Sequence, residues 1–150
     1  MNRAGDRDSG KESYASSSKY ITDSQPVGKR PDQRKRSGEI AENAVAEWML
    51  EQGYKIAERN WRCRQGELDL IAWDNGRLVV VEVRSARAGS RFGTALEALH
   101  SRKQQKVRLV ASVYVQQKGW SGNIRFDAAA VTLDYSGQRV EDIVYVRQAF

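Results

Sequence analysis

The chain has 150 residues, a net charge of +6 at pH 7 and an isoelectric point near 9.6. This length suits one domain with a tail, and 40% hydrophobic residues are enough for a core. No run approaches the roughly 18 apolar residues of a membrane-spanning helix, and the lone Cys63 excludes an internal disulfide or a cysteine-based zinc site. We therefore expect a soluble cytoplasmic protein with an anionic partner.

Polar sequence is concentrated at the start of the chain. Residues 1–37 hold nine Lys or Arg and five Asp or Glu, with runs of serine and few apolar residues. A segment that buries little apolar surface cannot offset the entropy cost of becoming ordered. We therefore predict a disordered basic tail over 1–37, either a solvated arm or a weak nucleic-acid contact, and a folded domain over 38–150.

The rest of the chain alternates between helical and strand patterns. Residues 39–52 have apolar residues at helical spacing, and Gly53 provides a stop. Strand patterns follow at 54–62, 68–73 and 78–83. Helical sequence then covers about 94–117, where a capping pattern at 94–97 opens a helix and residues 101–104 can open a second segment. Two more strands are predicted at 124–133 and 140–146. This order predicts an α/β (α+β) domain with a mixed sheet.

Asn75-Gly76 predicts a tight hairpin between the second and third strands, because a type I′ turn needs positive φ at both central residues. In that register Asp69 lies opposite Glu82, and Glu67 lies opposite Arg84. Since side chains alternate along a strand, these four residues share one face with Ile71, Trp73, Leu78 and Val80. The other face is apolar, with Leu68, Leu70, Ala72, Val79, Val81 and Val83.

Three carboxylates and one guanidinium thus converge at the far end of one face. Opposed Cβ atoms lie roughly 4.5–5.5 Å apart, and two carboxylates at that distance resist ionisation unless a cation lies between them. A divalent metal ion is one such cation. A cross-strand polar network, with Glu67 bound to Arg84, is the alternative, and the residues themselves leave both open.

Candidate nucleic-acid contacts lie outside the hairpin. Arg102, Lys103 and Lys106 could follow phosphates, although an ordinary exposed helix face looks the same. Trp61, close to Arg64, is a candidate for base stacking, whereas Trp48 and Trp73 are expected in the core. His100 is expected on the helix surface, and Asp127 at a polar strand end.

Several motifs occur in order: Gly66 to Ala72, Val80 to Arg84, Phe92-Gly93, Arg102 to Gln104, Arg125 to Asp127, and Ala149-Phe150. From about residue 38 onward the chain resembles the YraN family, small bacterial proteins regarded as predicted nucleases related to archaeal Holliday-junction resolvases. The resemblance implies a restriction-endonuclease-like αβββαβ core, in which helices flank a mixed central sheet.

The resemblance also implies an Asp…Glu-x-Lys nuclease signature. Asp69 and Glu82 match its carboxylates, and the Val83 carbonyl would join them in binding Mg²⁺ or Mn²⁺. A helical glutamate matches Glu42, with Glu39 one turn away as the alternative. The lysine position holds Arg84, which stays protonated and cannot act as a general base, although it can stabilise developing charge.

Together these observations predict a metal-dependent endonuclease that hydrolyses phosphodiester bonds, with catalytic candidates Asp69, Glu82, Arg84, Glu42 and Glu67. DNA is favoured over RNA as the partner, with branched and single-stranded DNA as the candidate substrates, and Arg102, Lys103, Lys106 and Arg64 are weak candidates for binding it. One alternative is a catalytically silent nucleic-acid-binding module that lost turnover at Arg84. Another is a protein-interaction domain whose carboxylates form only a polar strand end.

Overall fold

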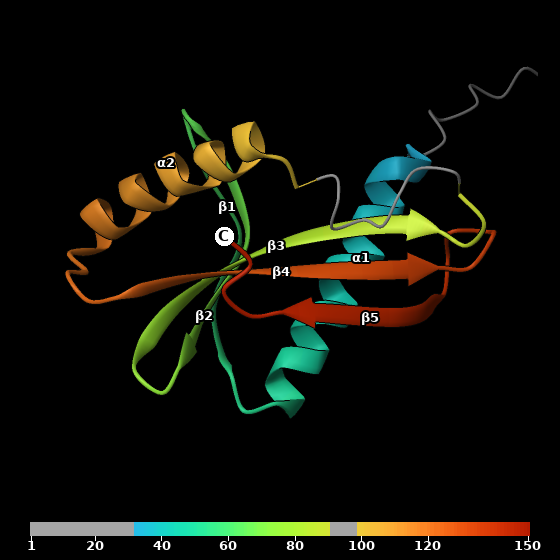
Figure 1. Ribbon diagram of the computed structural model, residues 1–150, viewed down its shortest axis with the longest axis horizontal. Helices are drawn as coiled ribbons and strands as arrows, with labels where there is room; N and C mark the ends of the chain where they lie inside the picture. Colours follow the sequence, from blue (N-terminus) through green and yellow to red (C-terminus); the bar gives the residue numbers. More distant parts are fainter. Residues whose placement is uncertain (1–31, 91–98) are drawn as a thin grey trace, which may run out of the picture.

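A five-stranded mixed sheet with one helix on each face forms the protein (Figure 1). The structure is a computed structural model that describes residues 32–90 and 99–150. Neither helix in these ranges is long and apolar enough to cross a membrane. The elements are α1 (Gln33–Glu51), β1 (Lys55–Cys63), β2 (Gly66–Asp74), β3 (Arg77–Arg87), α2 (Ser101–Lys118), β4 (Ile124–Leu133) and β5 (Val140–Val146).

The strands lie in the sheet in the same order as in the sequence. Neighbouring strands are antiparallel except for β3 and β4, which are parallel. Parallel neighbours need a crossover connection, and α2 provides it. The predicted α+β class, the αβββαβ order and the mixed sheet flanked by helices are therefore confirmed, and β5, also predicted, lies at the edge.

The turn at Asn75-Gly76 sets the register of β2 against β3. Both turn residues have positive φ, 48° for Asn75 and 80° for Gly76, as a type I′ turn requires. The paired residues run from Asp74 opposite Arg77 to Leu70 opposite Val81. This is the predicted register, and the ladder ends at that last pair.

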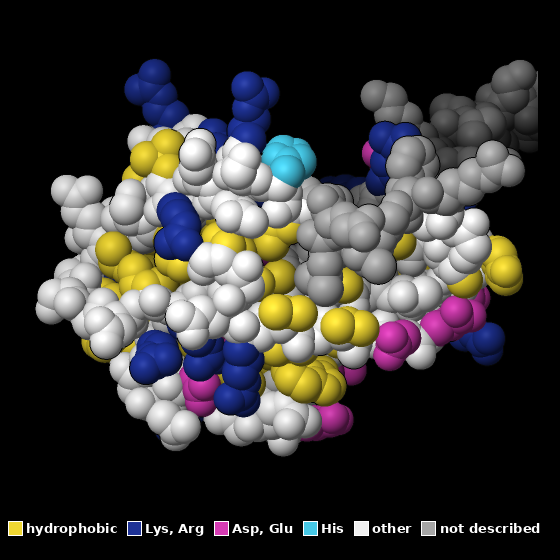
Figure 2. All heavy atoms as spheres, in the orientation of Figure 1, with side chains coloured by type: hydrophobic (Ala, Val, Ile, Leu, Met, Phe, Trp, Pro, Cys, Tyr) yellow, Lys and Arg dark blue, Asp and Glu magenta, His cyan; other side chains and the backbone are white. Residues whose placement is uncertain are grey.

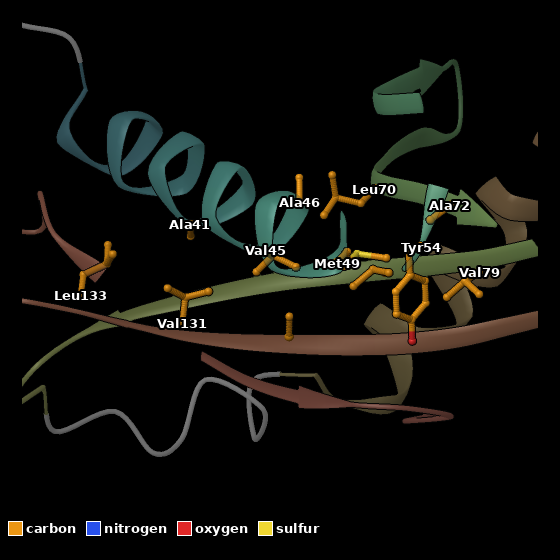
Figure 3. Close-up of a cluster of buried hydrophobic side chains, with 12 residues drawn as sticks. Ala41, Val45, Ala46, Met49, Tyr54, Leu70, Ala72, Val79, Val131 and Leu133 are labelled. Atoms are coloured by element: carbon orange, nitrogen blue, oxygen red, sulfur yellow. The ribbon is translucent and has the colours of Figure 1, made fainter. Parts of the chain in front are cut away.

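Each face of the sheet carries its own core. Figure 3 shows the core under α1, where Val45 and Met49 pack on β2 and β3 residues such as Leu70 and Val79. The second core lies under α2. Leu68 belongs to this second core with Ile71 and Val80, so its predicted place on the other face with Leu70 is wrong. The alternation of side chains breaks between Leu68 and Leu70, at Asp69.

Helix α1 begins earlier than predicted. Residues 33–37, assigned to the disordered tail, form the first turns of α1. The Asp32 side chain caps this helix by accepting a hydrogen bond from the Arg34 N–H, and the Ser37 hydroxyl donates to the Gly137 carbonyl. Polar contacts thus hold a segment that has little apolar surface to bury. Helix α2 begins at Ser101, and the capping pattern at 94–97 lies outside the described residues.

A fully buried carboxylate fixes the start of β4. Asp127 accepts hydrogen bonds from the Arg125 guanidinium, the Tyr145 hydroxyl and the Gln148 N–H, all at 2.8 Å. Arg125 also pairs with Asp74 at the end of β2. Burial, followed by the charge of Asp127, raises the pKa of Tyr145. This network joins β2, β4 and the chain end after β5.

Replacing Asp127 by Asn should destabilise the domain. The amide cannot neutralise the largely buried Arg125 or accept all of these hydrogen bonds, so we expect a loss of about 3 kcal/mol, moderated by the remaining pair with Asp74. Urea unfolding measures this free energy, with Glu141→Gln on the exposed face of β5 as a control that should change it by less than about 0.5 kcal/mol. Equal stability of the Asp127→Asn and parent proteins would contradict the structural role of this network.

Candidate active site

The candidate site lies where β2 leaves β3. Pairing between them ends at Leu70 and Val81, whereas β2 stays paired with β1 as far as Gly66. At this point Asp69 Oδ2 accepts a hydrogen bond of 2.8 Å from the Val83 N–H. The N–H and C=O of one strand residue point to the same edge of the strand, so the Val83 carbonyl faces the same space. We call this place, formed by residues 67–69 and 82–84, the β2–β3 fork.

Two buried carboxylates meet at the β2–β3 fork. Asp69 is 8% exposed and Glu82 only 3% exposed. The pKa of Asp69 is raised from 3.8 to about 8, first by burial and then by the neighbouring Glu82 charge, against the opposing effect of the Val83 N–H. The register prediction placed the two residues directly opposite each other in a ladder. Instead, the two carboxylates lie close together beyond the last pair of the ladder. The Asp69 side chain points to the edge of β3, where it binds the Val83 N–H.

A third carboxylate approaches from α1. The charge of Glu42 is one of the causes that raise the pKa of Asp69, and Glu39 is not among them. Burial is the main cause that raises the pKa of Glu42 itself, while a hydrogen bond with Asn60 opposes it. Asn60 has a positive φ of 50° inside β1. Of the two alternatives, Glu42 is therefore the one whose charge acts on Asp69.

Two cations from different elements share one oxygen of Glu82. Arg84 Nη2 lies 3.3 Å from Glu82 Oε1, and Lys103 Nζ, from the first turn of α2, lies 3.0 Å from the same atom. Sequence reasoning placed Lys103 only among weak nucleic-acid contacts. Its contact with Glu82 depends on how α2 packs over β3, and no local pattern reports that packing.

Glu67 is not part of this cluster of ion pairs. The predicted pair between Glu67 and Arg84 is wrong, because Glu67 Oε2 binds Arg62 Nε at 2.9 Å. Both side chains are on the exposed β1–β2 hairpin, and Arg62 lies directly opposite Glu67 in the ladder. Continued pairing of β2 with β1, after β2 has left β3, gives Glu67 a nearer partner.

The other predicted nucleic-acid residues lie near the fork but outside it. Arg64, Arg102 and Lys106 are exposed, and the Lys106 stem lies against Gly66 in the β1–β2 turn. Figure 2 shows Lys and Arg side chains projecting from the edge formed by this turn and α2, and acidic side chains along β5.

Trp61 packs edge-on against Tyr114, with 5.1 Å between the two ring centroids, which gives Trp61 a role in packing. The backbone of His100 caps α2, and its side chain makes no capping bond.

A groove lined with arginine adjoins the fork. It has a volume of about 610 Å³ and lies between the start of α1 and the end of β3, with Arg34, Arg84 and Arg87 in its lining. The remaining described lining residues are uncharged. A smaller cavity of about 220 Å³ continues it past Arg36 and Gly137. A polyanion is therefore the kind of ligand that this surface favours.

The donor set at the fork suits a hard divalent cation. Within residues 32–90 and 99–150, no group of three or more His, Cys, Asp and Glu side chains is arranged to hold a metal ion. Mg²⁺ commonly needs only one or two carboxylates, together with water and substrate phosphate. Asp69, Glu82 and the Val83 carbonyl meet that requirement, and burial together with the Glu82 charge raises the pKa of Asp69 there.

The element order is the one that the family resemblance implied. The sequence model of the Uncharacterised protein family UPF0102 matches residues 41–131. A UPF0102 protein of Pelotomaculum thermopropionicum is 42% identical over 120 residues, which are 79% of this chain and 98% of the relative. A UPF0102 protein of Moorella thermoacetica is 39% identical over 118 residues, which are 78% of this chain and 97% of that relative. The chain belongs to the UPF0102 family, which confirms the resemblance.

Among solved structures, a match is described as the crystal structure of a repair endonuclease from Pyrococcus abyssi. The TM-score is 0.34 and the sequence identity is 20%. The match covers 65% of this chain and 40% of that one, so the chain spans less than half of that protein's length.

The raised pKa of Asp69 predicts how stability depends on pH in the metal-free protein. Because the pKa is higher in the folded than in the unfolded state, the folded protein binds more protons, and stability falls as the pH rises from about 4 to about 8. Asp69→Asn removes the charge and keeps an acceptor for the Val83 N–H. One pKa unit corresponds to about 1.4 kcal/mol, and relaxation reduces the full effect, so we expect Asp69→Asn to gain on the order of 1–3 kcal/mol at pH 8 and less at pH 5.

Thermal unfolding of both proteins in EDTA at these two pH values measures the difference. A gain that is the same at pH 5 and pH 8 would contradict the assignment of this pH dependence to Asp69.

Proposed function

We propose that this protein is a Mg²⁺- or Mn²⁺-dependent nuclease that hydrolyses phosphodiester bonds in DNA, in branched or single-stranded substrates. The observation that carries the proposal is the pair of buried carboxylates, Asp69 and Glu82, beside Val83, where β2 no longer pairs with the edge of β3. Burying two adjacent acids is costly unless a cation binds there. Such a site therefore has a physical reason to take up a metal ion.

Asp69, Glu82 and the Val83 carbonyl are the proposed metal ligands, with Glu42 assisting from α1. When bound, a divalent ion supplies Lewis-acid catalysis and an activated water molecule. The Val83 N–H orients Asp69 through its hydrogen bond of 2.8 Å, so that the carboxylate is held in place before any ligand arrives. A preorganised polar group of this kind does not have to reorient during the reaction.

Arg84 connects the fork to the arginine-lined groove, because it contacts Glu82 and also lines the groove. Its guanidinium remains charged at any working pH and is suited to bind a phosphate through two hydrogen bonds. In this proposal Arg84, Arg34 and Arg87 bind the phosphate backbone of the strand that carries the bond to be cleaved. The mixture of arginines and neutral residues supports nucleic acid as the partner.

The cleavage assay uses the full chain with single-stranded, duplex and four-way-junction oligonucleotides, in Mn²⁺, in Mg²⁺ and in EDTA. We expect metal-dependent cleavage that Asp69→Asn and Glu82→Gln each reduce by at least about 10²-fold. Glu141→Gln, an exposed acid of β5, is the control and should cleave like the parent. A parent protein that binds these substrates but cleaves none of them with either metal would favour the silent binding module and rule out the nuclease.

Binding in EDTA tests the groove separately from catalysis. Each phosphate contact releases condensed counterions, so removing one arginine should lower the slope of log affinity against log salt by about one. We expect this change for Arg34→Ala and for Arg87→Ala in fluorescence anisotropy titrations between about 50 and about 200 mM salt. Lys55→Ala, at the start of β1, is the control. Salt-independent or absent binding by the parent would support a protein-interaction domain instead.

A further inference from the structure

Lys103 reaches the candidate site from a part of the chain remote from the hairpin. Its Nζ atom lies 3.0 Å from Glu82 Oε1, closer than the Arg84 guanidinium at 3.3 Å. Glu82 is almost completely buried, whereas 31% of the Lys103 side chain is exposed. The ammonium group therefore lies between the buried carboxylate and the solvent from which a substrate would approach.

The first turn of α2 holds Lys103 in this position. The Lys103 and Gln104 N–H groups donate to the His100 carbonyl, and the Gln104 side chain donates to the Leu99 carbonyl. One turn further on, Val107 is buried against the sheet. The packing of Val107 and the hydrogen bonds of the first turn therefore fix the position of the Lys103 backbone, from which its side chain extends. An ordinary solvated helix face does not explain a lysine that pairs with a carboxylate buried in the sheet.

The two cations at Glu82 differ in what they can still bind. An ammonium group has three donors, and the only ion pair of Lys103 within the described residues is the one with Glu82, so donors remain for a second anion. Arg84 is held less well, because its Nε atom is buried and has no hydrogen-bond partner among the described residues. Lysine is a compact point charge, whereas arginine needs a planar arrangement of acceptors.

We propose that Lys103 of α2 supplies the ammonium group that contacts the phosphate undergoing attack, a task for which the nuclease signature uses a lysine at the position of Arg84. Arg84 then serves to neutralise Glu82 and to bind the strand in the groove. The inference rests on the proposed nuclease function, and it concerns a different residue, on a different element, from those that define the metal site. With Lys103 in this role, the chain can carry Arg84 at the lysine position of the signature and still supply an ammonium group.

The test compares Lys103→Ala with Lys118→Ala, a control that removes a lysine from the same helix where it pairs with Glu58. Removing one preorganised charge from a transition state lowers the rate by about 10²–10³-fold, so we expect that loss in Mn²⁺-dependent cleavage for Lys103→Ala and less than about threefold for Lys118→Ala. The double variant Lys103→Ala/Arg84→Lys returns an ammonium group beside Glu82 and should recover at least about tenfold of the lost rate.

DNA binding in EDTA provides a second measurement that does not depend on turnover. We expect Lys103→Ala to lower the salt slope by about one and Lys118→Ala to leave it unchanged. Thermal unfolding identifies any misfolded variant, and the rescue in the double variant separates a catalytic contact from a purely structural ion pair.

The failures of the two proposals are distinguishable. If the parent cleaves and Lys103→Ala keeps both its rate and its salt slope, the role of Lys103 is wrong and the nuclease function stands. If Lys103→Ala loses rate and the Arg84→Lys exchange recovers none of it, the lysine acts only through the structure, which also overturns the inference. If the parent does not cleave, the nuclease function fails and the catalytic role of Lys103 fails with it.

Discussion

The carboxylate of Asp69 takes the place of a backbone acceptor opposite the Val83 N–H. A continuing β2–β3 ladder would pair this N–H with β2, and the two strands would then stay together. With the side chain in that role, β2 can leave β3, remain paired with β1 and bring Leu68 under α2. Strand β3 continues beside β4, and its other edge borders the arginine-lined groove. The break in the ladder therefore leaves the edge of β3 beyond Val81 unpaired with β2.

When all its acids are ionised, the fork carries more acidic than basic side chains. Asp69, Glu82 and Glu42 contribute three acids, whereas Arg84 and Lys103 contribute two bases. Both bases pair with Glu82, whereas the hydrogen bond that Asp69 accepts comes from a backbone N–H, which carries no net charge. These contacts organise the fork while leaving the Asp69 carboxylate without a cationic partner among the ion pairs of the described residues. Domains commonly carry such unfavourable electrostatics where they bind or catalyse, and stabilise the site through the surrounding packing.

Local patterns were sufficient to predict the element order and the hairpin register. Asn75-Gly76 fixed the register, because the turn geometry depends on only two residues. The start of α1 could not be predicted, since the contact of Ser37 with Gly137 joins residues distant in sequence. The same holds for Lys103, whose partner is determined by the packing of α2. The pairing of Glu67 was predicted wrongly because simple alternation does not reveal where a ladder ends.

The crossover between β3 and β4 has a consequence for how the site forms during folding. Strands β1, β2 and β3 are neighbours in sequence and need only short loops to meet, so both carboxylates of the fork belong to a locally connected unit. Lys103 arrives only when the chain from β3 through α2 to β4 closes the parallel pair, a long loop with a larger entropy cost. The acids are therefore expected to assemble before their ammonium partner, and the complete site then appears only in the last, cooperative stage of folding.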